Sequence, residues 1–441
     1  MARLFGTDGI RGIAGIELTS DLARRLGRAA VEVLGRHGAS QPPVVVVGRD
    51  PRESGEWLED ALTEGIVEAG GDVLLAGVEP TPAIAFMTLE LGASTGVVIS
   101  ASHNPADDNG IKFFSREGMK LPDHIEDEIE LELERSPRSP ARRGRISPTP
   151  EGREGYLLHL ERAADARLDG MRVVVDCANG SASDVAPRVL RSLGADVTPI
   201  HAAPDGRNIN EGCGALRPEV VAAEVVRIGA DVGVSHDGDA DRAMFSDAAG
   251  NVIDGDQVLA ASALAMHQHG TLKGDVVVGT VMSNLGLVRA MRDAGIELVQ
   301  TRVGDRYVLE EMERRGAMLG GEQSGHVIFR EHATTGDGLL TAVRFLSLAA
   351  LTGRSIGELA AAMRRYPQVM INVPVDDREG PLDAAAVEAA IAEAEAALAD
   401  RGRVLVRASG TEPLIRVMVE AETEDEASRY AAALADAVRR G

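Results

Sequence analysis

Residues 96–114 read GVVISASHNPADDNGIKFF, and this stretch predicts two buried strands joined by a polar loop. Its two apolar ends, GVVI and IKFF, have the composition of strands that fill a core. The loop places Ser102 and His103 at the end of the first strand, and the second strand carries Lys112. A hydroxyl beside an imidazole and an ammonium is a candidate nucleophile among groups that bind anions. The alternative is that Ser102 only caps a turn, because serine, asparagine and proline favour turns for local reasons.

The length and composition predict a multidomain protein with aliphatic cores. The chain has 441 residues, and single cores stop growing at roughly 250–300 residues. Aromatic residues supply only 3% of the sequence, so Val, Leu, Ile and Ala must fill the interior. No apolar run approaches the ~20 residues that span a bilayer, and the N-terminus lacks the apolar segment of a signal peptide. The two cysteines, Cys177 and Cys213, are too few for a disulfide framework, which indicates a reducing cytoplasm.

The charged residues narrow the class of partner. A formal net charge of −23 argues against nucleic acids and membranes as partners. Of the 46 Lys and Arg residues only three are lysines, at positions 112, 120 and 273. Because a lysine loses its proton more readily than an arginine, this bias suggests a chemical role for Lys112.

A strand–turn–helix–strand unit occurs three times along the chain. Each copy starts with a run of valines, at 44–47, 173–175 and 276–278, and continues through a polar turn and a helical pattern to a second strand. This order is typical of a parallel βαβ crossover in which a glycine ends the helix. The glycines concerned are Gly70, Gly194 and Gly295.

These units predict an α/β protein with three similar α/β domains, which have mixed or parallel sheets, and a smaller C-terminal α+β domain. After Pro367 the pattern changes to strands at 369–375, 403–407 and 414–420, with helices at 381–400 and from 424. Residues 135–150 carry four prolines, which indicates a linker or a long exposed loop. A second change lies at 247–255. We expect four domains, at 1–150, 151–250, 251–366 and 367–441.

Three aspartates at alternate positions form a candidate metal site. Asp237, Asp239 and Asp241 follow an apolar run, so they lie in a loop at a strand end. Three such carboxylates repel one another unless they converge on a cation, and octahedral Mg²⁺ completed by a substrate phosphate suits them. An EF-hand is excluded, because Arg242 and Ala248 stand where its loop needs Gly and Glu. The alternative is a solvated acidic turn.

Two further loops carry groups that bind sugars and phosphates. Residues 320–326 read GGEQSGH, in which Glu322 and Ser324 can receive sugar hydroxyls or an amine, although this loop alone is better explained as a tight turn. Residues 407–413 read RASGTEP, with Arg416 beyond, and such arginines, hydroxyls and backbone N–H groups form a phosphate cradle. A nucleotide P-loop motif is absent from the sequence.

Five motifs in this order resemble the α-D-phosphohexomutase superfamily. They are FGTDGIRG at 5–12 and the four loops around Ser102, Asp237, Glu322 and Arg407. The resemblance runs from residue 5 to about residue 420. The sequence motifs GEQSGH, SGTEP and VGDRY are similar to those of the bacterial phosphoglucosamine mutases, whereas phosphomannomutases and phosphoglucomutases usually have other residues in these loops.

The resemblance implies four domains around a central cleft and a serine that is phosphorylated in the active enzyme. By position this serine is Ser102, which would contact a Mg²⁺ ion bound by Asp237, Asp239 and Asp241. The charged active-site positions of the family match Arg11, His103, Lys112, Arg242 and His326. Its sugar contacts match Glu322 and Ser324, and its phosphate clamp matches Arg407, Ser409, Gly410, Thr411 and Arg416.

The chain departs from the family pattern at three places. Ala106-Asp107 stands where relatives often carry aromatic residues, Ala240 where glycine is common, and Ala408 where lysine is common. None of these changes removes a proposed catalytic group. The missing lysine makes phosphate binding depend more on Arg407 and Arg416.

The resemblance implies an isomerase that interconverts glucosamine 6-phosphate and glucosamine 1-phosphate for amino-sugar nucleotide and cell-wall precursor synthesis. The phosphoserine would donate its phosphoryl group to a free hydroxyl, and glucosamine 1,6-bisphosphate would be the intermediate. Lys112, helped by His103 or Arg242, is the candidate for handling the hydroxyl proton. Alternatives are a phosphomannomutase or phosphoglucomutase, a phosphosugar phosphatase, and a non-catalytic phosphosugar sensor. The expected partner is a small phosphosugar, and the oligomeric state stays open, a homodimer included.

Overall fold

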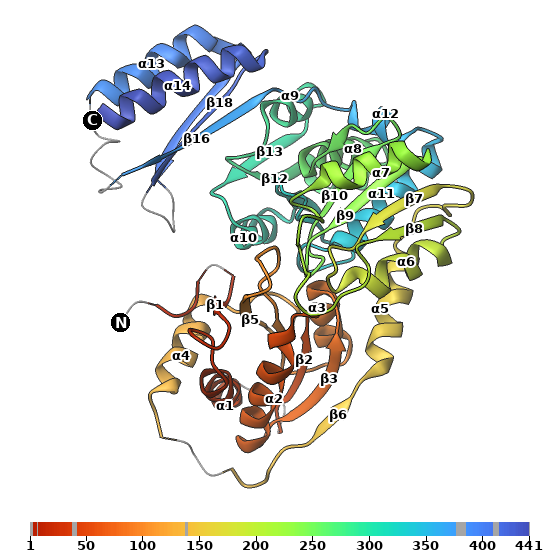
Figure 1. Cartoon of the computed structure of the whole chain (residues 1–441), viewed down its shortest axis with the longest axis vertical. Coiled ribbons are helices and arrows are strands. Elements are labelled where there is room, and N and C mark those ends of the chain that lie inside the picture. Colours follow the sequence, from red (N-terminus) through yellow and green to blue (C-terminus); the bar gives the residue numbers. More distant parts are fainter. Residues whose placement is uncertain are drawn as a thin grey trace. The chain divides into compact units, whose positions relative to one another are not determined.

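The computed structural model describes residues 3–6, 8–37, 42–136, 140–375, 385–408 and 414–440. The chain divides into two compact units. Unit 1 comprises residues 1–281 and 296–361, and unit 2 comprises residues 282–295 and 362–441. Figure 1 shows the helices and strands of the chain, coloured along the sequence. None of the helices in the described ranges is long and apolar enough to cross a membrane.

The first sheet of unit 1 has six strands, β1 (Ile10–Ile13), β2 (Val44–Arg49), β3 (Asp72–Val78), β4 (Thr95–Ile99), β5 (Asp108–Phe114) and β6 (Ile146–Pro148). Their order is β1-β5-β4-β2-β3-β6, with β2, β3, β4 and β6 parallel. The helices are α1 (Ser20–Arg36), α2 (Glu53–Glu68), α3 (Thr81–Glu90) and α4 (Asp123–Leu133). Every residue of β4 is buried, as expected for a parallel strand with helices on both faces of its sheet.

The second sheet of unit 1 has the order β11-β10-β9-β7-β8. Its strands β7 (Arg172–Asp176), β8 (Asp196–Ile200) and β9 (Val232–His236) are parallel, while β10 (Ala243–Asp247) and β11 (Val252–Ile253) continue antiparallel from β9. Helices α5 (Pro150–Arg162), α6 (Ala182–Ser192) and α7 (Pro218–Ile228) accompany this sheet. The carboxyl ends of the three parallel strands therefore lie at one edge, where polar loops follow each of them.

The third sheet of unit 1 has the order β13-β12-β14-β15. Its strands are β12 (Val276–Thr280), β13 (Glu297–Thr301), β14 (Leu319–Gly321) and β15 (Val327–Phe329). The helices of this region are α8 (Gly255–Gln268), α10 (Asp305–Arg315), α11 (Gly338–Thr352) and α12 (Ile356–Ala360).

Unit 2 has an antiparallel sheet of order β16-β18-β17. Its elements are β16 (Gln368–Pro374), β17 (Arg403–Ala408), β18 (Leu414–Glu420), α13 (Ala385–Leu398), α14 (Glu424–Arg440) and α9 (Leu285–Asp293). By sequence α9 belongs to the third repeat, between β12 and β13. The Leu285 backbone N–H at its start nevertheless donates to Glu420 Oε2 at 3.0 Å, so this helix is anchored to the last strand of unit 2.

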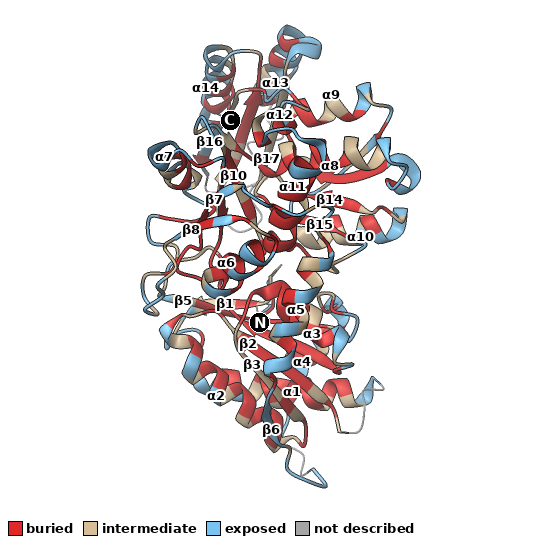
Figure 2. Ribbon diagram, turned by 90° about the vertical axis from the view of Figure 1, so that its right-hand side faces the viewer, coloured by how far each residue is buried: buried red, intermediate tan, exposed pale blue. Residues whose placement is uncertain are grey.

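The predicted fold class is confirmed: three mixed α/β sheets precede a small α+β domain. The predicted helix-ending glycines Gly70, Gly194 and Gly295 have positive φ angles of 91°, 102° and 73°. Figure 2 shows the central strands of the sheets as buried and the outer faces of the helices as exposed. The predicted linker at 135–150 is partly wrong, because residues 146–148 form the edge strand β6, which pairs with β3. Backbone pairing at a free sheet edge needs no apolar run, so the sequence pattern did not reveal it.

Candidate active site

The three aspartates lie together at the carboxyl end of β9. Asp237, Asp239 and Asp241 are 1%, 0% and 7% exposed, and one carboxylate oxygen of each lies within 4.8 Å of the others. The Thr81 backbone N–H at the start of α3 donates to the Asp239 carbonyl at 2.9 Å, and a second backbone bond comes from the start of α11. Two helix ends therefore hold this loop inside unit 1, and the alternative of a solvated acidic turn is wrong.

The carboxylates of this loop have oxygen atoms that suit a divalent cation. In the described part of the chain, Asp239 Oδ1 and Asp241 Oδ1 are buried without a hydrogen-bond partner. Burial, followed by the charges of Asp241 and Asp239, raises the pKa of Asp237 well above its ordinary value. A cation between the three carboxylates would remove this repulsion, and oxygen-only ligands are those that Mg²⁺ prefers. The residues fit a metal site.

Ser102 faces this loop from the end of β4. Its hydroxyl donates to Asp237 Oδ2 at 2.6 Å and lies 3.4 Å from His103 Nδ1. Its φ angle of 51° falls in the left-handed region, which a serine rarely adopts, and only 1% of the residue is exposed. The structure therefore brings the predicted nucleophile into contact with a predicted metal ligand.

Two residues without a recognisable sequence signal hold the Ser102 loop. Arg52 is fully buried, and its guanidinium donates to the Ser102 carbonyl at 3.0 Å and to the Asn104 carbonyl at 2.8 Å. Asn210 Nδ2 donates to the same two carbonyls at 2.9 and 3.0 Å. Arg52 lies 50 residues before Ser102 and Asn210 lies 108 residues after it, so only the fold reveals these contacts.

Ion pairs surround the aspartates with positive charge. Lys112 Nζ lies 3.0 Å from Asp239 Oδ2 and 2.9 Å from Asp8 Oδ2. Lys120 Nζ then links Asp8 to Asp305, at 2.8 and 2.5 Å. Burial acts to lower the pKa of Lys112, but Asp239 and Asp8 outweigh it and raise the pKa above its ordinary value. Lys112 therefore stays protonated and neutralises charge, which argues against a role as proton acceptor.

His326 and Arg242 contact the same aspartates. His326 Nδ1 lies 3.5 Å from Asp241 Oδ2, and the Gly336 backbone N–H donates to Nε2 at 3.1 Å. Burial lowers the pKa of His326, but its hydrogen bond and charge interaction with Asp241 raise it to about 9. The hydrogen bond from Gly336 requires an unprotonated Nε2 and opposes this rise in pKa, so His326 carries a single proton, on the Nδ1 that faces Asp241. Arg242 Nε lies 3.7 Å from Asp241 Oδ1 and 4.0 Å from Asp237 Oδ2.

The loop at 320–326 joins this site through its backbone. The Ala243 N–H donates to the Gly325 carbonyl at 3.1 Å, which places the loop beside the end of the aspartate loop. Glu322 Oε1 accepts from the Gly304 N–H at 3.1 Å. Ser324 Oγ is buried and makes no hydrogen bond within the described ranges. A hydroxyl without a partner and a half-buried carboxylate fit a polar ligand.

The two arginines of the predicted phosphate clamp lie opposite one another in unit 2. Arg407 on β17 pairs with Arg416 on β18. Burial, followed by the charge of Arg416, lowers the pKa of Arg407. Like charges at directly opposed positions destabilise a sheet unless an anion binds between them. The predicted residues Ser409, Gly410 and Thr411 lie outside the described residues.

Family models match nearly the whole chain. Domains I, II and III of phosphoglucomutase/phosphomannomutase match residues 2–138, 154–250 and 254–366, and the C-terminal domain of the same family matches residues 370–437. The chain belongs to the phosphoglucomutase/phosphomannomutase family. The resemblance noted in the sequence is thereby confirmed.

Full-length relatives narrow the family membership. The phosphoglucosamine mutase of Thermobifida fusca is 53% identical over 442 residues, which cover 100% of this chain and 98% of that protein. The phosphoglucosamine mutase of Frankia alni is 54% identical over 448 residues, with the same coverage of both chains. The predicted enzyme class, an isomerase acting on a phosphosugar, is confirmed by these relatives.

Solved structures show the same fold. A phosphoglucomutase/phosphomannomutase family protein from Burkholderia thailandensis aligns with a TM-score of 0.84 and 26% identity, covering 99% of this chain and 97% of its own. An N-acetylphosphoglucosamine mutase from Aspergillus fumigatus aligns with a TM-score of 0.72 and 18% identity, covering 99% and 95%.

The phosphohexomutase motifs contain further residues of the site that the sequence interpretation missed. Asp8 and Asp305 belong to the motifs FGTDGIRG and VGDRY, so their presence in the site had a signal. The scarcity of lysine also pointed to Lys120 and not only to Lys112. Arg11 pairs with Asp8, and its Nη1 lies 3.4 Å from Asn104 Oδ1. Unit 1 thus gathers all the predicted residues outside the phosphate clamp.

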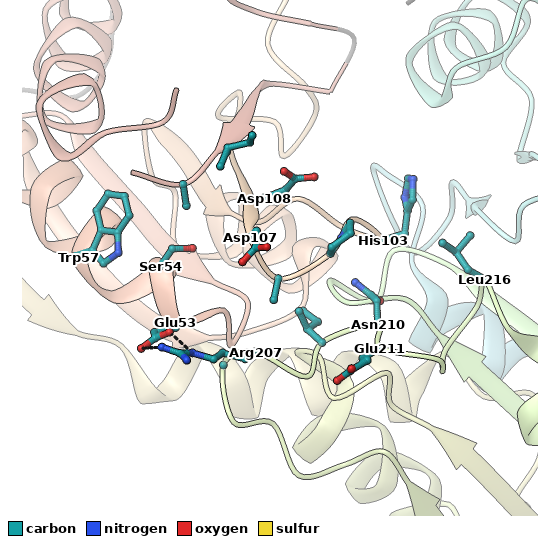
Figure 3. A pocket seen from close by; sticks show the side chains of 16 residues that line it. Glu53, Ser54, Trp57, His103, Asp107, Asp108, Arg207, Asn210, Glu211 and Leu216 are labelled. Atoms are coloured by element: carbon teal, nitrogen blue, oxygen red, sulfur yellow. Dashed lines mark hydrogen bonds and ion pairs between the residues drawn. The ribbon is translucent and has the colours of Figure 1, made fainter. Parts of the chain in front are cut away.

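A hollow of about 1290 Å³ lies beside the Ser102 loop. Figure 3 shows Asp107 and Asp108 on one side of it and Asn210 and Glu211 on the facing loop. His103 is the one catalytic candidate that lines this hollow, and no aspartate of the triad does. The hollow therefore lies next to the nucleophile loop and not over the candidate metal site.

Proposed function

We propose that this protein interconverts glucosamine 6-phosphate and glucosamine 1-phosphate and uses Ser102 as the carrier of the phosphoryl group. The observation that carries this proposal is the 2.6 Å contact between the Ser102 hydroxyl and Asp237, one of three convergent carboxylates. The full-length identity of 53% and 54% to phosphoglucosamine mutases supports the choice of substrate.

The three aspartates would hold a Mg²⁺ ion, together with an oxygen of the phosphorylated Ser102. When bound, the ion neutralises charge that develops on the transferred phosphoryl group. The Aspergillus fumigatus N-acetylphosphoglucosamine mutase was solved with GlcNAc-6P and magnesium, and another structure of that mutase was solved with glucose 1,6-bisphosphate. The buried carboxylate oxygens without partners in the described ranges are where this chain would bind its ion.

The transfer needs a proton acceptor. As the bond between phosphorus and Ser102 Oγ breaks, phosphorus bonds to a sugar hydroxyl oxygen, whose proton must leave. Lys112 is held as an ammonium by two carboxylates, so it does not accept this proton. His103 Nδ1 lies 3.4 Å from Ser102 Oγ, and burial, followed by the charges of two arginines, lowers its pKa to about 4. We therefore assign the proton transfer to His103, which takes the proton of the sugar hydroxyl and gives it to Ser102 Oγ as the phosphorus–oxygen bond breaks, and we assign charge neutralisation to Lys112.

The second half of the reaction reverses these roles. Glucosamine 1,6-bisphosphate would reorient in the site and return its other phosphate to Ser102, while His103 takes the proton of the Ser102 hydroxyl and gives it to the leaving sugar oxygen. The facing arginines of unit 2, Arg407 and Arg416, would bind the non-reacting phosphate, together with the predicted residues Ser409, Gly410 and Thr411. Closure of the C-terminal domain would exclude water, which separates a mutase from a phosphatase.

Discrimination between sugars must come from groups that bind carbon 2. Glu322 is the candidate, because near neutral pH the glucosamine amine is largely protonated and a carboxylate accepts a charge-assisted bond from it. One of its oxygens already accepts from Gly304, which leaves the other for the sugar. If Glu322 instead binds the hydroxyls at carbons 3 and 4, it would give no preference, because glucose and mannose share them.

A coupled assay with glucosamine, glucose and mannose monophosphates tests the proposed substrate. We expect the highest kcat/KM for the glucosamine phosphate, and a preference for either other sugar would reject the assignment. Glu322→Gln is the sharper variant, since the loss of the charge should reduce kcat/KM about tenfold more for the glucosamine than for the glucose substrate. Ser324→Ala serves as the control, because it removes a sugar contact that carries no charge.

The phosphatase alternative is tested by the release of inorganic phosphate. A phosphatase would release inorganic phosphate at the rate of substrate loss, whereas the mutase should release almost none.

Cys177 and Cys213 are free thiols in the structure, which agrees with the reducing cytoplasm that we propose as the location. With a net charge of −23, nucleic acids and membranes are not expected partners.

A further inference from the structure

A second group of metal-binding side chains lies at the carboxyl edge of the second sheet. Asp176 ends β7, His201 follows β8 directly, and Cys213 lies in the loop beyond (β7 and β8 are labelled in Figure 1). One ligand atom of each side chain lies within 4.8 Å of the other two. Asp176 and Cys213 are 0% and 1% exposed, whereas the His201 side chain is 34% exposed. This cluster shares no residue with the aspartate triad.

His201 and Asp176 lie at ion-pair distance without a hydrogen bond between them. His201 Nδ1 lies 3.2 Å from Asp176 Oδ1, yet this buried nitrogen makes no hydrogen bond within the described ranges. The carboxylate is fixed in place by two backbone N–H groups, from Ala178 to Oδ1 and from Gly214 to Oδ2, each at 2.9 Å. Two polar atoms at this distance that form no hydrogen bond with each other are arranged like ligands of one ion.

We propose that Asp176, His201 and Cys213 form a second metal site, which takes a borderline transition-metal cation such as Zn²⁺. Thiolate, imidazole and carboxylate are the ligands of zinc sites, and Mg²⁺ does not select sulfur or nitrogen ligands. Around a tetrahedral Zn²⁺ the ligand atoms lie about 3.5 Å apart, so distances of up to 4.8 Å in the cluster would shorten by at most about 1.3 Å. Water would take the fourth position on the exposed side of His201.

Binding of a divalent metal ion at this cluster releases one proton and leaves no net charge. The Cys213 thiol gives its proton to solvent as its sulfur bonds to the metal. The thiolate and the Asp176 carboxylate then carry two negative charges, which neutralise the dication. The competing explanation is that Asp176 only organises its loop and that His201 approaches it as an ordinary ion-pair partner. That explanation gives the Cys213 sulfur no role.

The position of the cluster connects it to the active-site loops. The loop between His201 and Cys213 carries Asn210, whose side chain bonds to the carbonyls of the Ser102 loop. The Ser181 N–H, five residues after Asp176, donates at 2.8 Å to the carbonyl of Gly238, which lies between two triad aspartates. An ion at the cluster would therefore fix the loops that hold the nucleophile and the triad, and its role would be structural.

Metal retention tests the second site without any use of activity. The full-length protein is stripped with a chelator, reloaded with Zn²⁺ or Co²⁺ in excess Mg²⁺, and desalted, and bound metal is measured by mass spectrometry. We expect about one Zn²⁺ per chain, and a sulfur-to-metal absorption band with Co²⁺. Wild-type protein that retains no Zn²⁺, or that shows no such band, would overturn the proposal.

Variants assign the ligands. Cys213→Ser should abolish the cobalt–sulfur band, and His201→Gln should weaken Zn²⁺ binding at least tenfold. The matched control is Cys177→Ser, because Cys177 is equally buried and follows Asp176 directly but lies outside the cluster. Equal loss in Cys177→Ser and Cys213→Ser would contradict the assignment.

A thermal measurement covers the case in which Cys213→Ser does not fold. His201 is partly exposed, so His201→Gln should fold normally. Zn²⁺ should raise the melting temperature of the wild type and of Asp239→Asn, which lacks one triad carboxylate, but not that of His201→Gln. An equal shift in His201→Gln, or no shift in Asp239→Asn, would refute a site at this cluster.

Discussion

Two clusters of three ligand side chains lie at the carboxyl edge of the same sheet, and they differ in how the chain assembles them. The triad Asp237, Asp239 and Asp241 comes from one loop after β9, at alternate positions. The second cluster comes from three separate places, after β7, after β8 and in the following loop. Local spacing builds the first cluster, and strand order builds the second.

The clusters also differ in charge. In the triad, three like charges meet in a buried place, and burial with the neighbouring carboxylates raises the pKa of Asp237. Lys112 on β5 partly offsets this repulsion. In the second cluster a single carboxylate is satisfied by two backbone N–H groups. A hard dication therefore suits the triad, and a softer metal suits the mixed ligands.

The largest effect is expected from the loss of Ser102, the proposed phosphoryl carrier, which contacts the triad. Ser102→Ala should reduce turnover by about 10⁴-fold or more, because the phosphoryl carrier is lost. It should also remove any phosphate detected by intact-mass measurement, while Zn²⁺ retention at the second cluster stays unchanged. Ser136→Ala, at an exposed serine, is the control. Retained activity with phosphate found elsewhere would reject Ser102.

Two triad substitutions should separate repulsion from ion pairing. Asp239→Asn and Asp237→Asn should both lose Mg²⁺-dependent activity. Asp239→Asn also takes one of the two carboxylates from buried Lys112, so we expect its free energy of unfolding to fall by about 3 kcal/mol. Asp237→Asn removes a repelled charge, its oxygen can still accept from the Arg242 N–H, and its amide can donate to the Ser102 hydroxyl, so in chelator it should unfold no more easily than the wild type.

The pH dependence of the unfolding free energy shows whether the charge on Asp237 destabilises the folded protein. The pKa of Asp237 is higher in the folded protein than in the unfolded chain, so the protonated carboxyl is favoured by folding. Wild-type protein in chelator should therefore lose stability as the pH rises through the folded pKa, and Asp237→Asn should lose less. Parallel curves of unfolding free energy against pH would contradict this explanation.

A smaller effect is expected at the loop that joins the two clusters. Asn210→Ala removes two hydrogen bonds to the Ser102 loop, which should lower kcat about tenfold while the KM for the sugar phosphate changes little. Asn210 has a φ of 60°, so alanine there also strains the backbone. Asn210→Gly is the matched control: it lacks the side chain but not the conformational freedom. If its kcat equals that of the wild type, strain and not positioning explains the effect.

The smallest effect on the free energy of unfolding is expected at two alanines, one in the loop of each cluster. Ala240 lies inside the triad loop and Ala178 follows Asp176, and their φ angles are 57° and 53°. Replacement of either by glycine removes a buried methyl group but relieves about 1–2 kcal/mol of strain. Both variants should stay within about 1 kcal/mol of the wild type in urea unfolding. Ala29→Gly in α1, where no strain is relieved, should lose about 2 kcal/mol.

The secondary-structure elements and the local motifs follow from short-range features of the sequence. The valine runs, the glycines after the helices and the alternate aspartates all act over a few residues, because backbone periodicity and strand ends place such neighbours without reference to the rest of the chain. The chemistry of the triad and of the Ser102 loop could therefore be predicted from the order of the residues alone.

The distant residues that complete the site could not be predicted, because the packing of the whole fold brings them together. Arg52, Asn210 and Lys120 act on partners at least 50 residues away, and the sequence around them has no pattern that depends on those partners. The same holds for the meeting of Asp176, His201 and Cys213. Their distances follow from the order of parallel strands and from the path of the connecting loops, and these depend on the packing of the whole unit.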